Sequence, residues 1–249
     1  MKTTFPKSVV MAAAALVAFS APVQASKMDN NIEASAKQTY VFKTYLQDDD
    51  IKIKSKDGAV TVSGVVADES HKLLAQETVA GLPDVKSVDN QLKIKGEPTK
   101  NSDAWLVTKV KSTLLFHRSV SAKTEVDVKD GIVTLKGAAA SPAQRELTTE
   151  YVKDIEGVKD VRNEMTVAGV ADEKRSVGDK IDDSSITAQV KMTLLYHRST
   201  SGINTKVTTK DGVVTLHGKA RNTAELDLAA KLTNDVKGVK AVDNRMIVE

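Results

Sequence analysis

Alternating apolar and polar positions recur three times along the chain, each time in two short runs joined by Asp-Gly. In the middle instance Val126 and Val128 alternate with charged residues before Asp130-Gly131, and apolar residues alternate again after it. A period of two indicates strands. Asp-Gly between such runs predicts a tight hairpin turn, because both central residues of that turn take positive φ.

A helix is predicted on each side of the middle hairpin. Leu106, Val110 and Leu114 have the spacing of one helical face before it. After it, Ser141-Pro142-Ala143-Gln144 offers an N-cap, a proline at the first helical position and a glutamine that closes a capping box. A last apolar strand follows. The pattern predicts an α+β domain of order αββαβ, a three-stranded sheet with two helices on one face.

Three copies of this unit follow one another. The hairpin motif Gly-x-Val-x-[Val/Leu]-x-Gly and the strand motif Val-Lys-x-Val-x-Asn recur together at shifts of 73 and 81 residues. In the 37 positions from Gly131 and from Gly212, copies two and three share 16 identical residues, which chance does not explain. The motif glycines, which we predict to be structural, are Gly58, Gly64, Gly131, Gly137, Gly212 and Gly218.

The repeats divide the chain into six parts. We expect a signal peptide at 1–25 and a flexible N-terminal segment at 26–38. The three domains are expected at 39–96, 102–168 and 183–249, with a charged linker at 169–182. The first copy is the atypical one, because it lacks about five residues between its first helix and its first strand.

The N-terminus has the features of an export signal. Lys2 and Lys7 precede a short apolar run from Val9 to Ser20, and small residues up to Ala25 offer a cleavage site before Ser26. The run is shorter than the roughly 20 residues of a membrane span. The sequence therefore predicts a soluble periplasmic product without a transmembrane anchor.

The repeated hairpin, helix and final strand together resemble the BON domain family, over roughly residues 39 to 249. The resemblance is to the soluble, osmotically inducible periplasmic members, although those have two such domains and this chain has three. It implies a function in envelope or osmotic stress and peripheral contact with anionic phospholipid. In some members it also implies chaperone-like help to secreted or outer-membrane proteins.

Composition and motifs give no sign of catalysis. The chain has no cysteine, which excludes disulfides and thiolate sites. Without the signal peptide, 34 basic residues face 33 acidic ones, so no basic excess favours nucleic acid. No nucleophile elbow, phosphate loop or metal-binding histidine pair occurs. We expect no enzyme activity, cofactor or metal, and interpret the equivalent His117 and His197 as cations at helix ends.

Asn90, Asn163 and Asn244 occupy one position in the final strand of the three copies. We interpret their side chains as hydrogen-bond partners of buried backbone groups near a bend in that strand.

Trp105 stands out, because a helical wheel places it on the side of Lys109 and Phe116, away from the face centred on Val110. We consider these three residues a candidate lipid or partner contact, with the tryptophan in the headgroup zone. The alternative is that Trp105 packs against a neighbouring copy.

Three functions remain open at this stage. The leading hypothesis is a periplasmic envelope-stress protein that binds anionic phospholipid or envelope surfaces. The alternatives are a periplasmic holdase for secreted or outer-membrane proteins and an adaptor to peptidoglycan or to outer-membrane assembly proteins.

Overall fold

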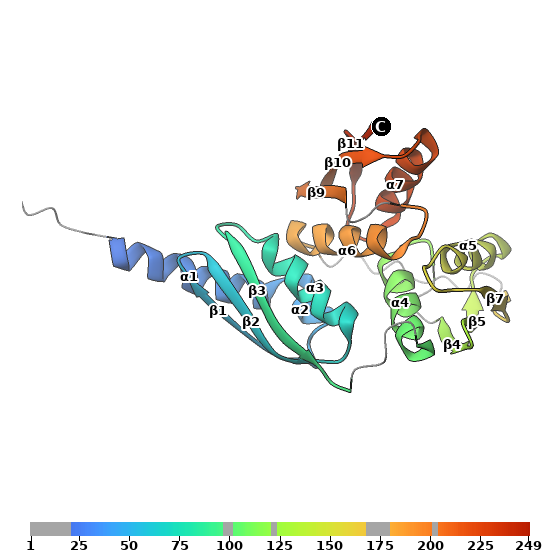
Figure 1. Cartoon of the computed structure of the whole chain (residues 1–249), viewed down its shortest axis with the longest axis horizontal. Helices are drawn as coiled ribbons and strands as arrows, with labels where there is room; N and C mark the ends of the chain where they lie inside the picture. Colours follow the sequence, from blue (N-terminus) through green and yellow to red (C-terminus); the bar gives the residue numbers. More distant parts are fainter. Residues whose placement is uncertain (1–20, 97–101, 121–123, 168–179, 201–203) are drawn as a thin grey trace, which may run out of the picture.

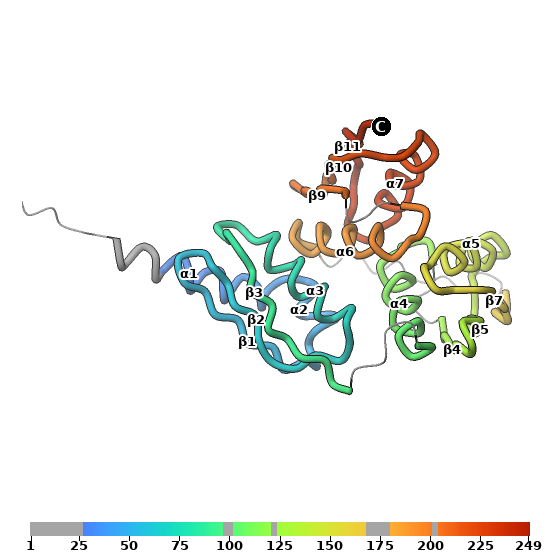
Figure 2. The backbone as a smooth tube through the Cα atoms, in the orientation of Figure 1, coloured from blue at the N-terminus to red at the C-terminus, as the bar shows by residue number. Residues whose placement is uncertain are grey.

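The computed structural model of the chain describes residues 21–96, 102–120, 124–167, 180–200 and 204–249, with side chains from residue 27 onward. Three small α/β units follow one another along the chain and pack into one body (Figure 1). The tube in Figure 2 traces the first unit at one end of the body and the other two side by side at the opposite end. None of the helices in these described ranges is long and apolar enough to cross a bilayer.

Domain 1 is a three-stranded sheet with helices on one face. Strand order is β1-β2-β3, antiparallel between the first two strands and parallel between β2 and β3. Its elements are α1 (Ala21–Gln38), α2 (Tyr40–Thr44), β1 (Asp50–Lys56), β2 (Ala59–Val66), α3 (Glu69–Ala80) and β3 (Ser87–Ile94).

Domains 2 and 3 repeat this topology with the final strand split in two, and in domain 2 the middle strand is split as well. Domain 2 contains α4 (Asp103–Phe116), β4 (Glu125–Lys129), β5 (Ile132–Lys136), β6 (Ala138–Ala139), α5 (Pro142–Lys153), β7 (Asp160–Asn163) and β8 (Thr166–Val167). Domain 3 contains α6 (Asp183–Tyr196), β9 (Thr205–Lys210), β10 (Val213–Ala220), α7 (Thr223–Asp235), β11 (Ala241–Asn244) and β12 (Ile247–Val248). The predicted α+β fold of three tandem αββαβ domains is confirmed.

Each hairpin turns at its Asp-Gly pair, as predicted. Asp130 and Gly131 have φ of 55° and 81°, and the other two pairs are nearly identical. A carboxylate from the first helix of the same domain accepts both turn amides: Asp103 Oδ2 lies 2.7 Å from the Asp130 nitrogen and Oδ1 lies 2.9 Å from the Gly131 nitrogen. Asp29 and Asp183 do the same in domains 1 and 3. This contact fixes the helix onto the hairpin.

The prediction of a flexible segment at residues 26–38 is wrong. These residues lie in α1, where Ile32 and Ala36 are 3% and 0% exposed in the core of domain 1. Asp29 anchors the helix to the β1–β2 turn, and Glu33 accepts a hydrogen bond from the Ser55 amide at 2.9 Å. The polar composition of this segment suggested a flexible chain, but its acidic side chains accept hydrogen bonds from the hairpin. Of the predicted signal peptide, residues 1–20 lie outside the described part of the chain.

The interpretation of the repeated asparagines is confirmed. The Asn163 amide donates to the Arg145 carbonyl of α5 at 2.8 Å, and its oxygen accepts from the Met165 amide at 3.0 Å. Asn90 and Asn244 make the equivalent pair of bonds in domains 1 and 3. Each asparagine therefore connects the second helix to the last strand.

Helix α6 of domain 3 is buried on two opposite faces and is shared between two cores. One face carries Ile186, Val190 and Leu194 in the core of domain 3. The opposite face carries Ala188, Met192 and Tyr196 in the core of domain 1. Domain 1 is therefore completed by a helix that belongs to domain 3.

Polar contacts hold domain 1 on this helix. The Tyr40 amide, at the break between α1 and α2, donates to Asp182 Oδ2 at 2.7 Å, and the Val41 amide donates to Ser185 Oγ at 3.0 Å. On α3, Glu77 pairs with Lys191 at 2.6 Å. The start of domain 3 thus caps the helix break of domain 1.

We predict that Ile32→Ala lowers the free energy of unfolding by about 2–4 kcal/mol, because it removes buried methyl groups from the α1 face in the core. The matched control, Lys37→Ala, changes an exposed residue on the same helix and is expected to stay within about 0.5 kcal/mol. Urea unfolding of the full chain measures both. Equal effects would mean that this helix does not contribute to the core.

Candidate functional site: the seam between domains 2 and 3

Domains 2 and 3 contact each other through equivalent surfaces, one on each domain. The three residues after the first helix of each domain (117–119 and 197–199) dock onto the end of the second helix of the other domain (234–239 and 153–158). Because residue 117 is equivalent to 197, and residue 154 to 235, the contact has an approximate two-fold symmetry like that of an isologous dimer. We call these four segments the seam.

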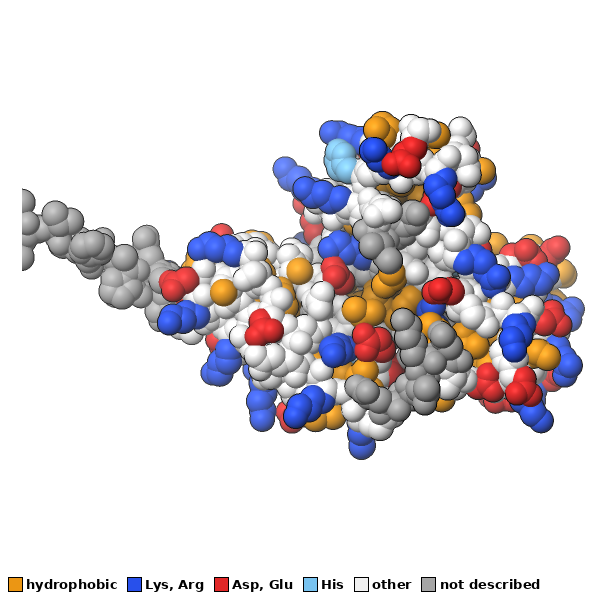
Figure 3. All heavy atoms as spheres, viewed as in Figure 1, with side chains coloured by type: hydrophobic (Ala, Val, Ile, Leu, Met, Phe, Trp, Pro, Cys, Tyr) orange, Lys and Arg blue, Asp and Glu red, His pale blue; other side chains and the backbone are white. Residues whose placement is uncertain are grey.

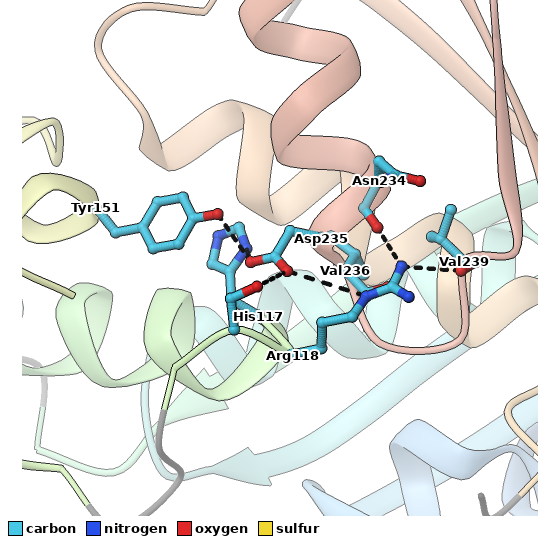
Figure 4. A network of polar contacts seen from close by, with 8 residues as sticks. His117, Arg118, Tyr151, Asn234, Asp235, Val236 and Val239 are labelled. Carbon is cyan, nitrogen blue, oxygen red and sulfur yellow. Dashed lines mark hydrogen bonds and ion pairs between the residues drawn. The ribbon is translucent and has the colours of Figure 1, made fainter. Parts of the chain in front are cut away.

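Figure 4 shows one half of the seam. His117 Nδ1 lies 3.1 Å from Asp235 Oδ2, and the Ser119 hydroxyl donates to Asp235 Oδ1. Arg118 reaches the carbonyl oxygens of Asn234, Val236 and Val239, the last at 2.9 Å. The guanidinium thereby donates to carbonyl groups at and just beyond the end of α7, where cations are favoured.

The other half repeats these contacts with the domains exchanged. His197 Nδ1 lies 2.9 Å from Asp154 Oδ2, and the Ser199 hydroxyl donates to Asp154 Oδ1. Arg198 donates to the carbonyl oxygens at the end of α5, those of Lys153, Ile155 and Val158, at 2.7–2.9 Å.

Main-chain bonds run alongside the side-chain contacts. The Arg118 amide donates to the Asp235 carbonyl at 2.9 Å, and the Arg198 amide donates to the Asp154 carbonyl at 2.8 Å. His117 and Val236 form an isolated antiparallel bridge, and Ile155 and His197 form its counterpart. Backbone pairing fixes the register, so the side-chain contacts cannot slide along the partner helix end.

Burial and hydrogen bonding together determine the charge states of His117 and Asp235 in the seam. Desolvation lowers the pKa of His117, which is fully buried, and outweighs the effect of the neighbouring Asp235 carboxylate. Burial works against the charged form of Asp235, but the bonds from His117, Ser119 and Tyr151 outweigh it and hold its pKa below the ordinary value. We take the pair as a neutral imidazole that donates from Nδ1 to an ionised carboxylate.

One contact breaks the symmetry. Tyr151 stacks on the His117 ring with 4.1 Å between ring centres, and its hydroxyl donates to Asp235 Oδ2 at 2.8 Å. The equivalent residue in domain 3 is Leu232, which lies in the apolar core. Asp235 therefore accepts a tyrosine hydrogen bond that has no counterpart at Asp154.

The arrangement of serine, histidine and aspartate does not form a hydrolytic triad. In such a triad the serine hydroxyl bonds to the histidine nitrogen remote from the carboxylate. Here the Ser119 hydroxyl donates to Asp235, on which His117 also sits. Both histidines are at most 2% exposed, which leaves no open surface beside them for an organic substrate. The geometry is suited to docking two domains.

The residues predicted to touch lipid lie elsewhere than expected. Phe116 is 2% exposed and belongs to the core of domain 1, beside the Tyr45 ring at 5.7 Å between centres. Lys109 is 3% exposed, with Nζ 4.2 Å from the Trp105 ring centre and 5.1 Å from that of Tyr196. Trp105 is half-buried against the core of domain 2.

The expectation of a lipid contact is thus wrong for Lys109 and Phe116, which are buried, whereas Trp105 is half-buried and its lipid contact stays a prediction. The helical wheel identified the side of α4 that faces away from its own sheet. That side is covered by domains 1 and 3, which the wheel of a single helix does not represent.

Sequence reasoning also missed the role of the two histidines, which are buried hydrogen-bond partners of aspartates in the facing domain. A usable signal was present: His-Arg-Ser and the aspartate at the end of the second helix recur together in domains 2 and 3. Domain 1 has neither, with Lys43 and Gly81 at the corresponding positions.

The BON domain model matches residues 28–96, 102–169 and 182–249. The chain belongs to the BON domain family. The first BON match begins at 28, within α1, whereas we expected domain 1 to begin at 39. The matched segments include both sides of the seam and all three Asp-Gly hairpins.

Three relatives illustrate this membership. Osmotically-inducible protein Y of Escherichia coli is 33% identical over 144 residues, 57% of this chain and 70% of that protein. The outer membrane lipoprotein DolP of Haemophilus influenzae is 28% identical over 146 residues, 58% of this chain and 73% of the relative. The 21 kDa hemolysin of Actinobacillus pleuropneumoniae is 33% identical over 121 residues, 49% and 60% of the two chains.

We predict that the double variant Arg118→Ala/Arg198→Ala loosens the seam, because the carbonyl groups at two helix ends lose their donors. Amide hydrogen exchange at 153–158 and 234–239 should accelerate about tenfold or more. Arg162→Ala, on the exposed outer face of BON domain 2, is the control and should leave both segments unchanged. Unchanged exchange in the double variant would contradict the role of these arginines.

Proposed function

We propose that this protein is an envelope or osmotic-stress protein that binds anionic phospholipid surfaces through the outer sheet faces of BON domains 1 and 3. The observation that carries the proposal is the charge of these faces. In each domain the helices cover one side of the sheet, and the residues on the other side alternate with the core residues and point to solvent.

The outer face of domain 1 carries four lysines, three on β1 and one on β3. Cross-strand pairing aligns Lys52, Lys54 and Lys56 of β1 with small residues of β2, Ser63, Thr61 and Ala59. Lys93 of β3 pairs with the exposed Val65. Four lysines face the two carboxylates of Asp50 and Asp89, a difference of two positive charges (4 − 2).

The outer face of domain 3 has the same sign. It carries Lys206 and Lys210 on β9, Lys219 on β10 and Arg245, against the carboxylates of Asp243 and Glu249 (4 − 2). Exposed apolar side chains lie among them: Val213 is 40% exposed and Ile247, paired with Lys219, is 61% exposed. Cations around a protruding isoleucine suit the headgroup region of a bilayer.

Domain 2 has the opposite character at the equivalent positions. Its outer face contains Glu125, Asp127, Asp160 and Glu164, against Lys129, Lys136 and Arg162 (3 − 4). In Figure 3 acidic and basic side chains intermingle on the domain at the right. The sheet face of domain 2 therefore serves as a control for those of domains 1 and 3.

The local charge of these faces contributes more to attraction by an anionic bilayer than the net charge of the whole chain does. A lysine near an anionic bilayer contributes on the order of 1 kcal/mol, and the attraction decays within a Debye length of about 8 Å at physiological salt. Local clusters of three or four lysines therefore matter more than an overall balance near zero. Attraction of this kind is lost at high salt.

The envelope location rests on two further supports. The N-terminal run has the features of an export signal. The relatives named above include one described as osmotically inducible and one described as an outer membrane lipoprotein. Both agree with a periplasmic protein that meets a membrane surface from outside the cytoplasm.

We predict that Lys52→Glu/Lys54→Glu/Lys56→Glu, or Lys206→Glu/Lys210→Glu/Lys219→Glu, weakens vesicle binding tenfold or more, at about 1 kcal/mol per lysine. The vesicles contain phosphatidylglycerol and phosphatidylethanolamine, and co-sedimentation gives the affinity. The control triple, Lys129→Glu/Lys136→Glu/Arg162→Glu, changes the net charge equally on the sheet face of domain 2 and should bind like the parent.

Two results would contradict the proposal. Equal loss in the domain 2 triple would mean that only net charge matters. Equal binding to phosphatidylcholine vesicles would mean that anionic headgroups are not recognised. The holdase alternative predicts suppression of client aggregation without lipid, and the same three variants distinguish it, because a holdase does not depend on these lysines.

A further inference from the structure

Two buried nitrogen atoms in the seam have no hydrogen-bond partner in the described part of the chain. They are His117 Nε2 and His197 Nε2, on side chains that are 0% and 1% exposed. An imidazole nitrogen that is buried without a partner is costly unless something binds it. The docking role of the seam uses Nδ1 of each ring and leaves Nε2 unexplained.

The opposite nitrogen of each ring is held as in metal-binding histidines. Nδ1 of His117 and Nδ1 of His197 each lie against an aspartate carboxylate, at 3.1 and 2.9 Å. A carboxylate on Nδ1 fixes the ring orientation and makes Nε2 a more basic ligand. Since an ionised carboxylate only accepts hydrogen bonds, Nδ1 carries a proton in each ring, and Nε2 of the neutral ring presents a lone pair.

The two rings are also the right distance apart. Their centres are separated by 5.9 Å and their planes are inclined by 82°. An ion bound at about 2.0 Å from two Nε2 atoms would hold the ring centres about 6 Å apart when the three atoms are close to a line. Inclined planes are compatible with this, because each ring can rotate about its bond to the ion.

From these observations we infer that the seam binds one monovalent copper ion between His117 Nε2 and His197 Nε2. No group of three or more His, Cys, Asp or Glu side chains that could hold a metal occurs in the described ranges. Zinc sites in proteins have three or four protein ligands. Cu(I), with a filled d shell, accepts two imidazoles in a line, and Ag(I) shares this geometry.

The surroundings suit a single positive charge. The carboxylates of Asp235 and Asp154 each lie against Nδ1 of one ring, so the negative charge beside the two imidazoles favours a cation between them. Tyr151 packs against His117 and lies 5.9 Å from His197 between ring centres, which closes the site on one side. Since each domain contributes one ligand, bound metal would tie domains 2 and 3 together.

The chain offers a clean test, because it has four histidines and no cysteine. Purified full-length protein is titrated with Cu(I) under argon in competition with a chromogenic chelator, and with Ag(I) by calorimetry. We expect one ion per chain. His117→Gln and His197→Gln should each weaken binding a hundredfold or more. The control His71→Gln/His217→Gln removes the two histidines outside the seam and should bind like the parent.

A measurement on the unmutated protein guards against variants that fail to fold. X-ray absorption of the Cu(I)-loaded chain should show two nitrogen ligands, and nitrogen NMR should shift Nε2 of two histidines while their Nδ1 atoms stay protonated. Binding that survives both seam variants, loss in the His71/His217 control, or unshifted seam histidines would overturn the inference. Ordered water between the rings in a crystal grown with Cu(I) would overturn it as well.

Discussion

The arrangement of domains 2 and 3 depends on the exchange of helix-end contacts between them. A helix leaves its last carbonyl groups without partners, and the end of each second helix here receives an arginine, a serine and a histidine from the neighbouring domain. Because both domains have the His-Arg-Ser motif and the aspartate it binds, each domain both gives and receives the same set of contacts. Breaking the seam exposes two helix ends and two buried histidine–aspartate pairs at once, so its parts are expected to separate together.

The same geometry explains how small domains form a stable body. A unit of about 65 residues buries only a modest core by itself. In this chain α6 supplies Ala188, Met192 and Tyr196 to domain 1 while its other face fills domain 3. The seam positions α6 and α4 relative to each other, and Phe116 of α4 also enters the core of domain 1. The domains are repeats in sequence but share their interior in the structure.

Local rules predicted each domain well. The Asp-Gly turns, the caps of the second helices and the bonds of Asn90, Asn163 and Asn244 all depend on residues close in sequence or within one domain. The polar segment at 26–38 was mistaken for a loose tail because Asp29 finds its partners 28 residues later. Lys109 and Phe116 were assigned to the surface because nothing in the periodicity of one helix reveals that other domains cover it.

Repetition with divergence leaves room for specialisation. The outer sheet faces of domains 1 and 3 are basic and that of domain 2 is not, although their core positions are equivalent. Helix α6, shared with domain 1, and the seam with domain 2 would together hold the three outer faces in a constant relation. Whether domains 2 and 3 form one rigid unit is therefore central to the account.

Distances between spin labels on the two domains test that rigidity most directly, and the absence of native cysteine allows clean labelling. Cysteines placed at the exposed positions Arg162 and Lys206, one in each domain, carry the labels. The seam predicts a single narrow distance distribution in solution. A broad or multimodal distribution in the otherwise unmodified chain would contradict a fixed arrangement of domains 2 and 3.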